Sequence, residues 1–367
     1  VVKRDVVRLV TPGTLTEDSL LDARRHNFLA AYAEIRGGGA FAWTDISTGA
    51  FHVLPLSPET LGTHLSRIQP RELIVVQASE ADLRLIADET NTALTPLSRA
   101  AFDSAGALTR LCAVFSVQTL DAFGEFSRPE IAAMGAVLEY LEITQKGKVP
   151  RLHPPVQETQ TSVMQIDAAT RRNLELTRAL SGGRAGSLLA SVDQTLTAGG
   201  GRLLETRISS PSCDLDMIQS RLDAVEYMTQ ETRLCDDMRS SLSQVPDLER
   251  ALSRLALDRG GPRDLAAIRN GLTQAQVLSG QISDQALPDL LREIGKDMTK
   301  KSDLLDLLDQ ALVAEPPVLS RDGGFIADGY NSELEEARHL RDEGRSVIAA
   351  MQADLQALDT CFLCQIS

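Results

Sequence analysis

Four acidic residues in the N-terminal third are the side chains whose type could support metal-dependent chemistry. Asp45 ends the alternating run AFAWTD, Glu72 opens the apolar run ELIVV, and Asp82 and Asp88 fall on a predicted helix. Hydrolysis assisted by two metal ions needs several converging carboxylates, but none of these four lies in a recognisable acidic motif. Because Asp45 precedes Ser47–Gly49, it can instead accept hydrogen bonds from the amides of a turn. We favour this structural role and keep a metal-dependent nuclease with Asp45 as a metal ligand as the alternative.

Three glycine clusters are candidates for phosphate-binding loops, namely Gly37–Gly39, Gly182–Gly183 and Gly199–Gly201. None has the GxxxxGK[ST] spacing with which a loop wraps the phosphates of ATP. Gly199–Gly201 is followed by Arg202, without a Lys-Ser or Lys-Thr pair. We therefore predict no cofactor-binding residue and no ATP-binding loop in this chain.

Metal ligands are equally sparse. Cys361 and Cys364 form a CxxC pair, which in other proteins is half of a zinc site or a redox pair. The sequence has no second CxxC and no HxxxH to complete four ligands, so we expect two reduced thiols near the end of the chain. His153 stands among prolines with no Cys or other His nearby. We predict no metal-binding residue and no catalytic residue.

The composition indicates a multidomain protein without a large nucleic-acid surface of its own. A length of 367 residues suggests about two or three domains. The net charge of -14 and the 4% aromatic content argue against a broad phosphate-binding face or base-stacking platforms. Five cysteines suggest a reducing cytoplasm, and no apolar run approaches the roughly 18 residues of a membrane span. The chain opens within a charged alternating run, without Met, as a fragment of a longer protein would.

The N-terminal third has the pattern of an α/β sheet. The run VVKRDVVRLV at residues 1–10 alternates like a strand, and Thr11–Thr14 is a turn. The runs AFAWTDIS and AFHVLPL flank Thr48-Gly49 and predict a hairpin. A helix is expected over residues 58–68, followed by a buried parallel strand in the run RELIVV at residues 71–76.

The remainder has the pattern of helices. Helical residues are expected over 113–145, until the three prolines within residues 147–157 mark a domain boundary. Asp167 is expected to cap a helix reaching about Leu180, and two short helices should flank the Gly-rich turn at residues 199–201. Residues 214–227 carry an amphipathic stripe of Leu215, Ile218, Leu222 and Val225, and Pro262 should begin a helix.

A long last helix is predicted from about Asn331. It would place Ile348, Met351, Leu355 and Leu358 on a seam with a 3.5-residue period, which suits a lever or a dimerisation helix. We expect self-association or disorder beyond about Gly344, because a seam without its partner is exposed. Paired arginines on the predicted helices have acids nearby and are expected to form surface ion pairs: Arg171 and Arg172, Arg250 and Arg254, and Arg338 and Arg341.

Several segments, in order and spacing, resemble the MutS family of bacterial DNA mismatch-repair proteins. The run RDGGFIADGYNSELEEAR at residues 321–338 looks like part of its core domain. VTPGT at 10–14, DISTG at 45–49 and the strand at 73–76 look like its connector domain. Further segments resemble the core domain: residues 166–176, Thr197, Gly200, Arg202–Leu204, Asp247–Arg250, Arg254, Leu255 and Pro262–Leu265.

The resemblance implies a fold and a function. It implies a ribonuclease-H-like α/β connector at residues 1–155, then an all-helical core with long lever helices at 156–367, truncated before the clamp and ATPase domains. The parent family binds mismatched duplex DNA as a dimer, uses ATP and Mg, and recruits MutL. This chain would supply the MutL-facing connector and the levers, without enzymatic activity of its own. Arg207, where we expect an aromatic residue, and the ending CFLCQIS depart from the family pattern. A standalone helical dimerisation scaffold is a further alternative.

Overall fold

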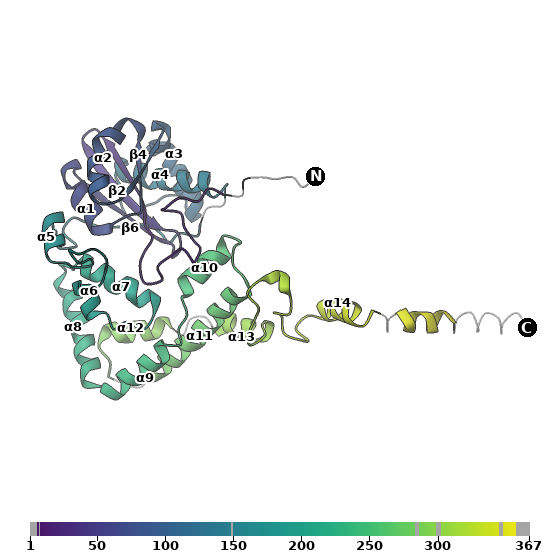
Figure 1. Cartoon of the computed structure of the whole chain (residues 1–367). Helices are drawn as coiled ribbons and strands as arrows, with labels where there is room; N and C mark the ends of the chain where they lie inside the picture. Colours follow the sequence, from purple (N-terminus) through teal and green to yellow (C-terminus); the bar gives the residue numbers. More distant parts are fainter. Residues whose placement is uncertain are drawn as a thin grey trace, which may run out of the picture.

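A six-stranded mixed sheet organises the first part of the computed structural model (Figure 1). The structure describes residue 6 and residues 8–147, 150–282, 286–298, 302–344 and 348–356. The strand order is β5-β4-β1-β2-β3-β6, with β1, β2 and β3 antiparallel and the other pairings parallel. The strands are β1 (Leu29–Ile35), β2 (Gly38–Asp45), β3 (Ala50–Leu56), β4 (Glu72–Val76), β5 (Ala93–Leu97) and β6 (Val156–Gln157).

The predicted hairpin and the predicted buried parallel strand are both confirmed in this sheet. The hairpin is β2–β3, in which Asp45 pairs with Ala50 across the turn. β4 is buried and runs parallel to β1 and β5, as the run RELIVV predicts. The strand predicted at residues 1–10 is wrong in its described part, since residues 6 and 8–10 form none. The N–H of Leu9 instead donates to the carbonyl of Thr144 at the end of a helix, 2.8 Å away.

Helices cover both faces of the sheet, because the side chains of its central strands alternate between two apolar cores. In β1, Leu29 and Ala31 face a core shared with α4 (Arg128–Thr144), which packs against α3 (Ser104–Phe115). Ala30 and Tyr32 face the opposite core. That second core includes α1 (Leu61–Ile68) and α2 (Glu80–Glu89). The helix predicted at residues 58–68 is confirmed as a 3-10 turn leading into α1.

The helical stretch predicted at residues 113–145 is two helices rather than one. Ser116 takes a left-handed φ of 55°, which ends α3. The Ser127 amide and hydroxyl both donate to the Glu130 carboxylate, at 2.8 and 2.6 Å, which fixes the start of α4. Where the two helices cross, Gly135 lies against Ala107.

From residue 158 onward the described chain is mainly helical, so the predicted mixture of an α/β part with an all-helical part is confirmed. Leu234, Ile282 and Leu287 form a further small core. The helices are α5 (Ala168–Asn173), α6 (Leu188–Val192), α7 (Ala198–Ser209), α8 (Leu215–Gln230), α9 (Thr232–Leu242), α10 (Leu248–Ala256), α11 (Pro262–Ile282), α12 (Asp289–Asp297), α13 (Ser302–Ala311) and α14 (Ser332–Asp342).

Two expectations in this part need correction. Asp167 does cap α5, but the helix ends at Asn173 instead of near Leu180, because Glu175 takes a left-handed φ of 48°. Gly199–Gly201 forms the first turn of α7 instead of a loop between helices. The Thr197 hydroxyl caps this turn by accepting from the Gly200 amide at 2.9 Å.

The apolar stripes on two predicted helices lie largely in solvent. In α8, Leu215 is 78% and Val225 60% exposed. The last predicted helix is interrupted, since α14 ends at Asp342 and a separate helical segment covers residues 348–356. Its Met351 is exposed, whereas Leu358 lies outside the described residues. α14 projects away from the rest of the molecule (Figure 1).

The close crossing of α3 and α4 predicts opposite effects for two glycine substitutions. A Cβ at Gly135 would lie 2.2 Å from the Ala107 Cβ, so Gly135→Ala should lower the free energy of unfolding by about 1–3 kcal/mol. A Cβ at Gly280 on α11 would meet nothing within 4 Å, so Gly280→Ala should raise it by about 0.5–1 kcal/mol. Urea denaturation followed by circular dichroism measures both, and equal effects would refute the packing described here.

Candidate functional site

Arginines join the sheet-containing region (residues 8–157) to the helical region that follows. In Figure 1 the sheet-containing region stands above α7 and α10. A guanidinium carries five donors and no acceptor, so one side chain can bridge several oxygens. Arg24, Arg25 and Arg67 reach across from the sheet-containing region. From the helical region, the residues that reach back are Arg202, Arg250, Arg254 and Arg259. We call this set of contacts the arginine junction.

Arg202 on α7 is the most buried member of the junction, with 1% of its surface exposed. Its guanidinium donates to both carboxylate oxygens of Asp247, at 2.7 and 2.9 Å. It also donates to Glu249 at 2.7 Å and to the carbonyl of Ala23 at 2.8 Å. The first turn of α7 therefore binds both the start of α10 and the loop before β1.

Arg202 and Asp247 stabilise each other's charged form. Burial lowers the pKa of Arg202, but the hydrogen bonds and charges of Asp247 and Glu249 outweigh it and raise that pKa above its usual range. Burial raises the pKa of Asp247, but the hydrogen bond and charge of Arg202 outweigh it and lower that pKa. Both groups thus stay ionised, and removing Asp247 would leave the buried Arg202 with only the half-exposed Glu249 as a charged partner.

Arg250 extends the junction from α10 to backbone oxygens. It is 2% exposed and donates to the carbonyls of Asp22 and Arg25, at 2.9 and 2.8 Å. Three residues later, the Ser253 hydroxyl donates to the carbonyl of Ile46 at 2.5 Å. α10 is therefore fixed both to the loop at residues 16–26 and to the turn of the β2–β3 hairpin.

Further ion pairs surround this buried centre. Arg254 pairs with Asp18 at 2.6 Å, and Arg259 donates to the Thr16 hydroxyl at 3.0 Å. On the other side, Arg25 pairs with Glu205 of α7 at 3.1 Å. The loop at residues 16–26 is thus held from two helices along its length.

The surface role expected for the paired arginines is wrong for two of them. Arg171 is 6% exposed and donates to the carbonyl of Ser209 at 2.7 Å, and Arg250 is buried as described. Their hydrogen-bond acceptors are backbone carbonyls, although Nε of Arg250 also lies 3.8 Å from the Asp247 carboxylate. Arg172 and Arg341 are exposed, as expected, and Arg341 pairs with Asp342 at 2.6 Å.

Asp45 has a complete set of structural partners. One carboxylate oxygen accepts from the Ser47 amide and hydroxyl, at 2.9 and 2.7 Å. The other accepts from the Asn27 amide at 3.2 Å and lies 2.8 Å from Nδ1 of His26. Burial raises the pKa of Asp45, but the bonds and charge from these neighbours outweigh it and hold the pKa below its usual range. Asp45 thus ties the hairpin turn to the start of β1.

The other acidic candidates do not converge on Asp45. Glu72 accepts hydrogen bonds from the Gly13 amide at 3.0 Å and the Tyr140 hydroxyl at 2.6 Å, while Asp82 and Asp88 lie exposed on α2. Within the described residues, no group of three or more His, Cys, Asp or Glu side chains is placed to hold a metal ion. The geometry supports the structural role of Asp45.

The remaining candidates are dispersed. Gly37 has a left-handed φ of 82° at the β1–β2 turn, and Gly182 and Gly183 have φ values of 89° and 83°. His153 is exposed, and its amide donates to the Gly49 carbonyl at 2.8 Å. Cys361 and Cys364 lie outside the described residues. None of the described helices is both long and apolar enough to cross a membrane.

Comparison with known proteins identifies both regions. A family model described as MutS domain II matches residues 27–153, and one described as MutS domain III matches residues 169–361. The DNA mismatch repair protein MutS of Roseobacter denitrificans is 60% identical over 98% of this chain. The proteins of the same name from a Ruegeria species and from Cereibacter sphaeroides are 61% and 62% identical over 96% of it. The chain spans about two fifths of the length of these relatives, 40–41%.

The double role of Asp247 predicts a large effect when its carboxylate is removed. Asp247→Ala leaves Arg202 buried with the half-exposed Glu249 and also removes the cap of α10. We expect the free energy of unfolding to fall by about 3–5 kcal/mol. Asp214→Ala is the matched control, because it removes the cap of α8 and no buried ion pair, and it should lower stability by only about 1 kcal/mol. Urea titrations that gave equal losses would contradict the central role of the junction.

The lowered pKa of Asp45 predicts an acid dependence of stability. A carboxyl with a pKa below about 3.9 in the fold stabilises the protein above that pH, and the stabilisation disappears as the pH falls through the folded value. The stability difference between the wild type and Asp45→Asn should therefore shrink as the pH falls below about 4. Asp82→Asn, on the exposed face of α2, is the control. A stability difference that does not change with pH would show that Asp45 does not act as an ionised hydrogen-bond acceptor in the fold.

Proposed function

Because the chain belongs to the MutS family of DNA mismatch-repair proteins, we propose that it forms the connector and core region of such a protein and links their movements. In this proposal residues 1–155 are a ribonuclease-H-like connector and residues 156–367 are the helical core with its levers. The order β3-β2-β1-β4-β5, with parallel and antiparallel pairs, supports the first assignment. The succession of helices from α5 to α14 supports the second.

The arginine junction is the observation that carries this proposal. Arg202 and Arg250 are buried, and each bonds to backbone carbonyls of the loop at residues 16–26. A contact of this kind transmits displacement, since an arginine that left these acceptors would leave its own buried guanidinium donors unsatisfied. A shift of α7 or α10 would therefore move the sheet-containing region as well.

The activities of the whole protein enter as further parts of the proposal. The parent protein would bind mismatched duplex DNA as a homodimer in the cytoplasm and use ATP and Mg elsewhere in its sequence. The connector would face MutL, and this chain alone would hydrolyse no ATP. The chain's own contribution would be mechanical, by connecting the site that binds MutL to the levers.

Three assays on the purified chain test this division of labour. We expect saturable binding of purified bacterial MutL in biolayer interferometry and no ATP turnover above the buffer rate. A mismatched and a fully paired duplex should bind with equal weakness, because the net charge is -14. ATP hydrolysis by the chain would refute the assignment of a non-catalytic role. Absence of MutL binding would refute the connector's role as a docking surface.

A further inference from the structure

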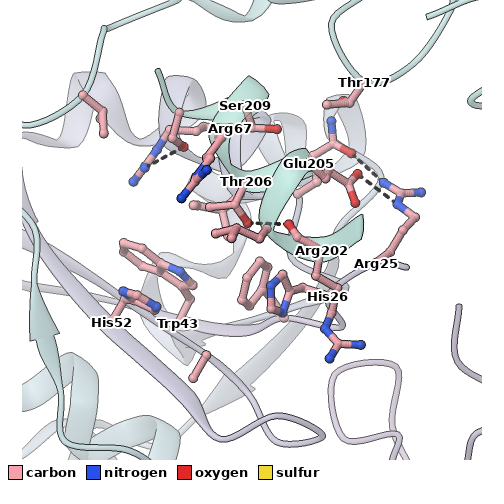
Figure 2. Close-up of a pocket in the computed structure, with 18 of the residues that line it drawn as sticks. Arg25, His26, Trp43, His52, Arg67, Thr177, Arg202, Glu205, Thr206 and Ser209 are labelled. Carbon is pink, nitrogen blue, oxygen red and sulfur yellow. Dashed lines mark hydrogen bonds and ion pairs between the residues drawn. The ribbon is translucent and has the colours of Figure 1, made fainter. Parts of the chain in front are cut away.

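A cavity of about 750 Å³ lies between the sheet and α7. Figure 2 shows Trp43 and His52 on one side and Arg202 and Thr206 of α7 on the other. Its volume lies within the range of about 300–1,000 Å³ that is typical of sites for small ligands. A nucleic-acid duplex is too wide to enter such a space, so the cavity suits a small molecule.

The cavity is positively charged, although the chain as a whole is acidic. Seven arginines and four carboxylates line it, against a net charge of -14 for the protein. Every one of these carboxylates already has partners. Glu158 pairs with Arg67, Glu205 with Arg25 and Glu249 with Arg202, while Asp214 accepts the amides of Asp216 and Met217 as the cap of α8. The remaining positive charge is therefore not balanced by the lining itself.

Four of the lining arginines, Arg71, Arg178, Arg207 and Arg221, form no ion pair with any described residue. They form two groups by their place in the fold: Arg207 and Arg221 lie on α7 and α8, whereas Arg71 precedes β4 and Arg178 follows α5. Burial and the nearby charges of Arg25 and Arg71 outweigh the charge of Glu205 and lower the pKa of Arg178, and burial and Arg221 lower the pKa of Arg207. Like charges held this close repel each other, and a bound anion would relieve that repulsion.

Two buried donors in the same lining lack an acceptor among the described residues. They are the Nε atoms of Arg67 and Arg202, whose side chains are 3% and 2% exposed. These Nε atoms have almost no accessible surface, so a ligand in the cavity would instead meet the guanidinium groups of the four arginines without an ion pair. Oxyanions suit these groups, because planar guanidinium groups match phosphate geometry.

We propose that this cavity binds a small anion with two or more phosphoryl groups. The two arginine groups would each take one phosphoryl group, with Arg71 and Arg178 on one side and Arg207 and Arg221 on the other. Phe28, Ile68 and Leu203 add apolar surface to the lining. The same polyphosphate chemistry occurs free, as in pyrophosphate, and within a nucleotide. This binding does not depend on the function proposed above.

Trp43 provides a direct test, because it is the only tryptophan of the chain and lines the cavity. Its fluorescence should change saturably when pyrophosphate is added at low ionic strength without divalent metal. Pyrophosphate should bind at least about tenfold more tightly than orthophosphate, since it can engage both arginine groups. ATP binding as tightly as pyrophosphate would identify a site for the polyphosphate alone. Tighter ATP binding would identify a nucleotide site that also uses the apolar wall.

Two double variants, each lacking two positive charges, distinguish binding in this cavity from nonspecific electrostatic attraction. Arg207→Gln with Arg221→Gln should weaken pyrophosphate binding at least about tenfold. Arg172→Gln with Arg341→Gln removes the same charge from exposed positions outside the cavity and should leave the affinity unchanged. Circular dichroism spectra of both variants verify that they fold. Absence of a saturable signal, equal affinity for orthophosphate, or equal weakening by both variants would overturn the proposal.

Discussion

The bidentate pair between Arg202 and Asp247 is the contact on which the arrangement of the two regions depends. Arg202 is buried and charged, so α7 can pack in this position only if Asp247 lies opposite it. Asp247 also caps α10, which fixes the start of that helix and with it the direction of Arg250. One ion pair therefore fixes the positions of two helices and of a second buried arginine. Such hydrogen-bond networks can be stronger than the sum of their separate pairs.

The loop at residues 16–26 explains why the junction is built from arginines. An irregular segment between two regions has carbonyls with no partners in a helix or sheet, and these accept from donors elsewhere. Arg202 donates to the carbonyl of Ala23, and Arg250 donates to the carbonyls of Asp22 and Arg25. A lysine would supply a point charge in place of a planar fork, so it could not bridge an acid and a carbonyl in the same way.

Local sequence patterns predicted many of the helices and strands, but they could not predict contacts between residues far apart in the chain. Alternation identified β2 and β3, a continuous apolar run identified β4, and Pro262 marked the start of α11. The burial of Arg250 could not be foreseen, because its acceptors are backbone oxygens 225 and 228 positions away. α5 ends because Glu175 takes a left-handed φ, and residue preferences do not predict that conformation for a glutamate. Among the site residues, Asp247 entered only through the family resemblance, which gives its position without its contacts. Arg250 and Arg254 were also expected to form surface ion pairs, and Arg202 was otherwise noted only as the residue after a glycine cluster.

The junction and the cavity share side chains, and this has a thermodynamic consequence. Arg25, Arg67 and Arg202 hold the two regions together and also line the cavity. Any ligand that draws these guanidinium groups toward itself changes the strength of their bonds to Glu205, Glu158 and Asp247. By linkage, a movement that opens the junction must change the affinity of the cavity by the same factor. The excess positive charge at this place in an acidic chain thus serves two purposes, since it satisfies carbonyls of an irregular loop and leaves a site whose occupancy is tied to the position of α7.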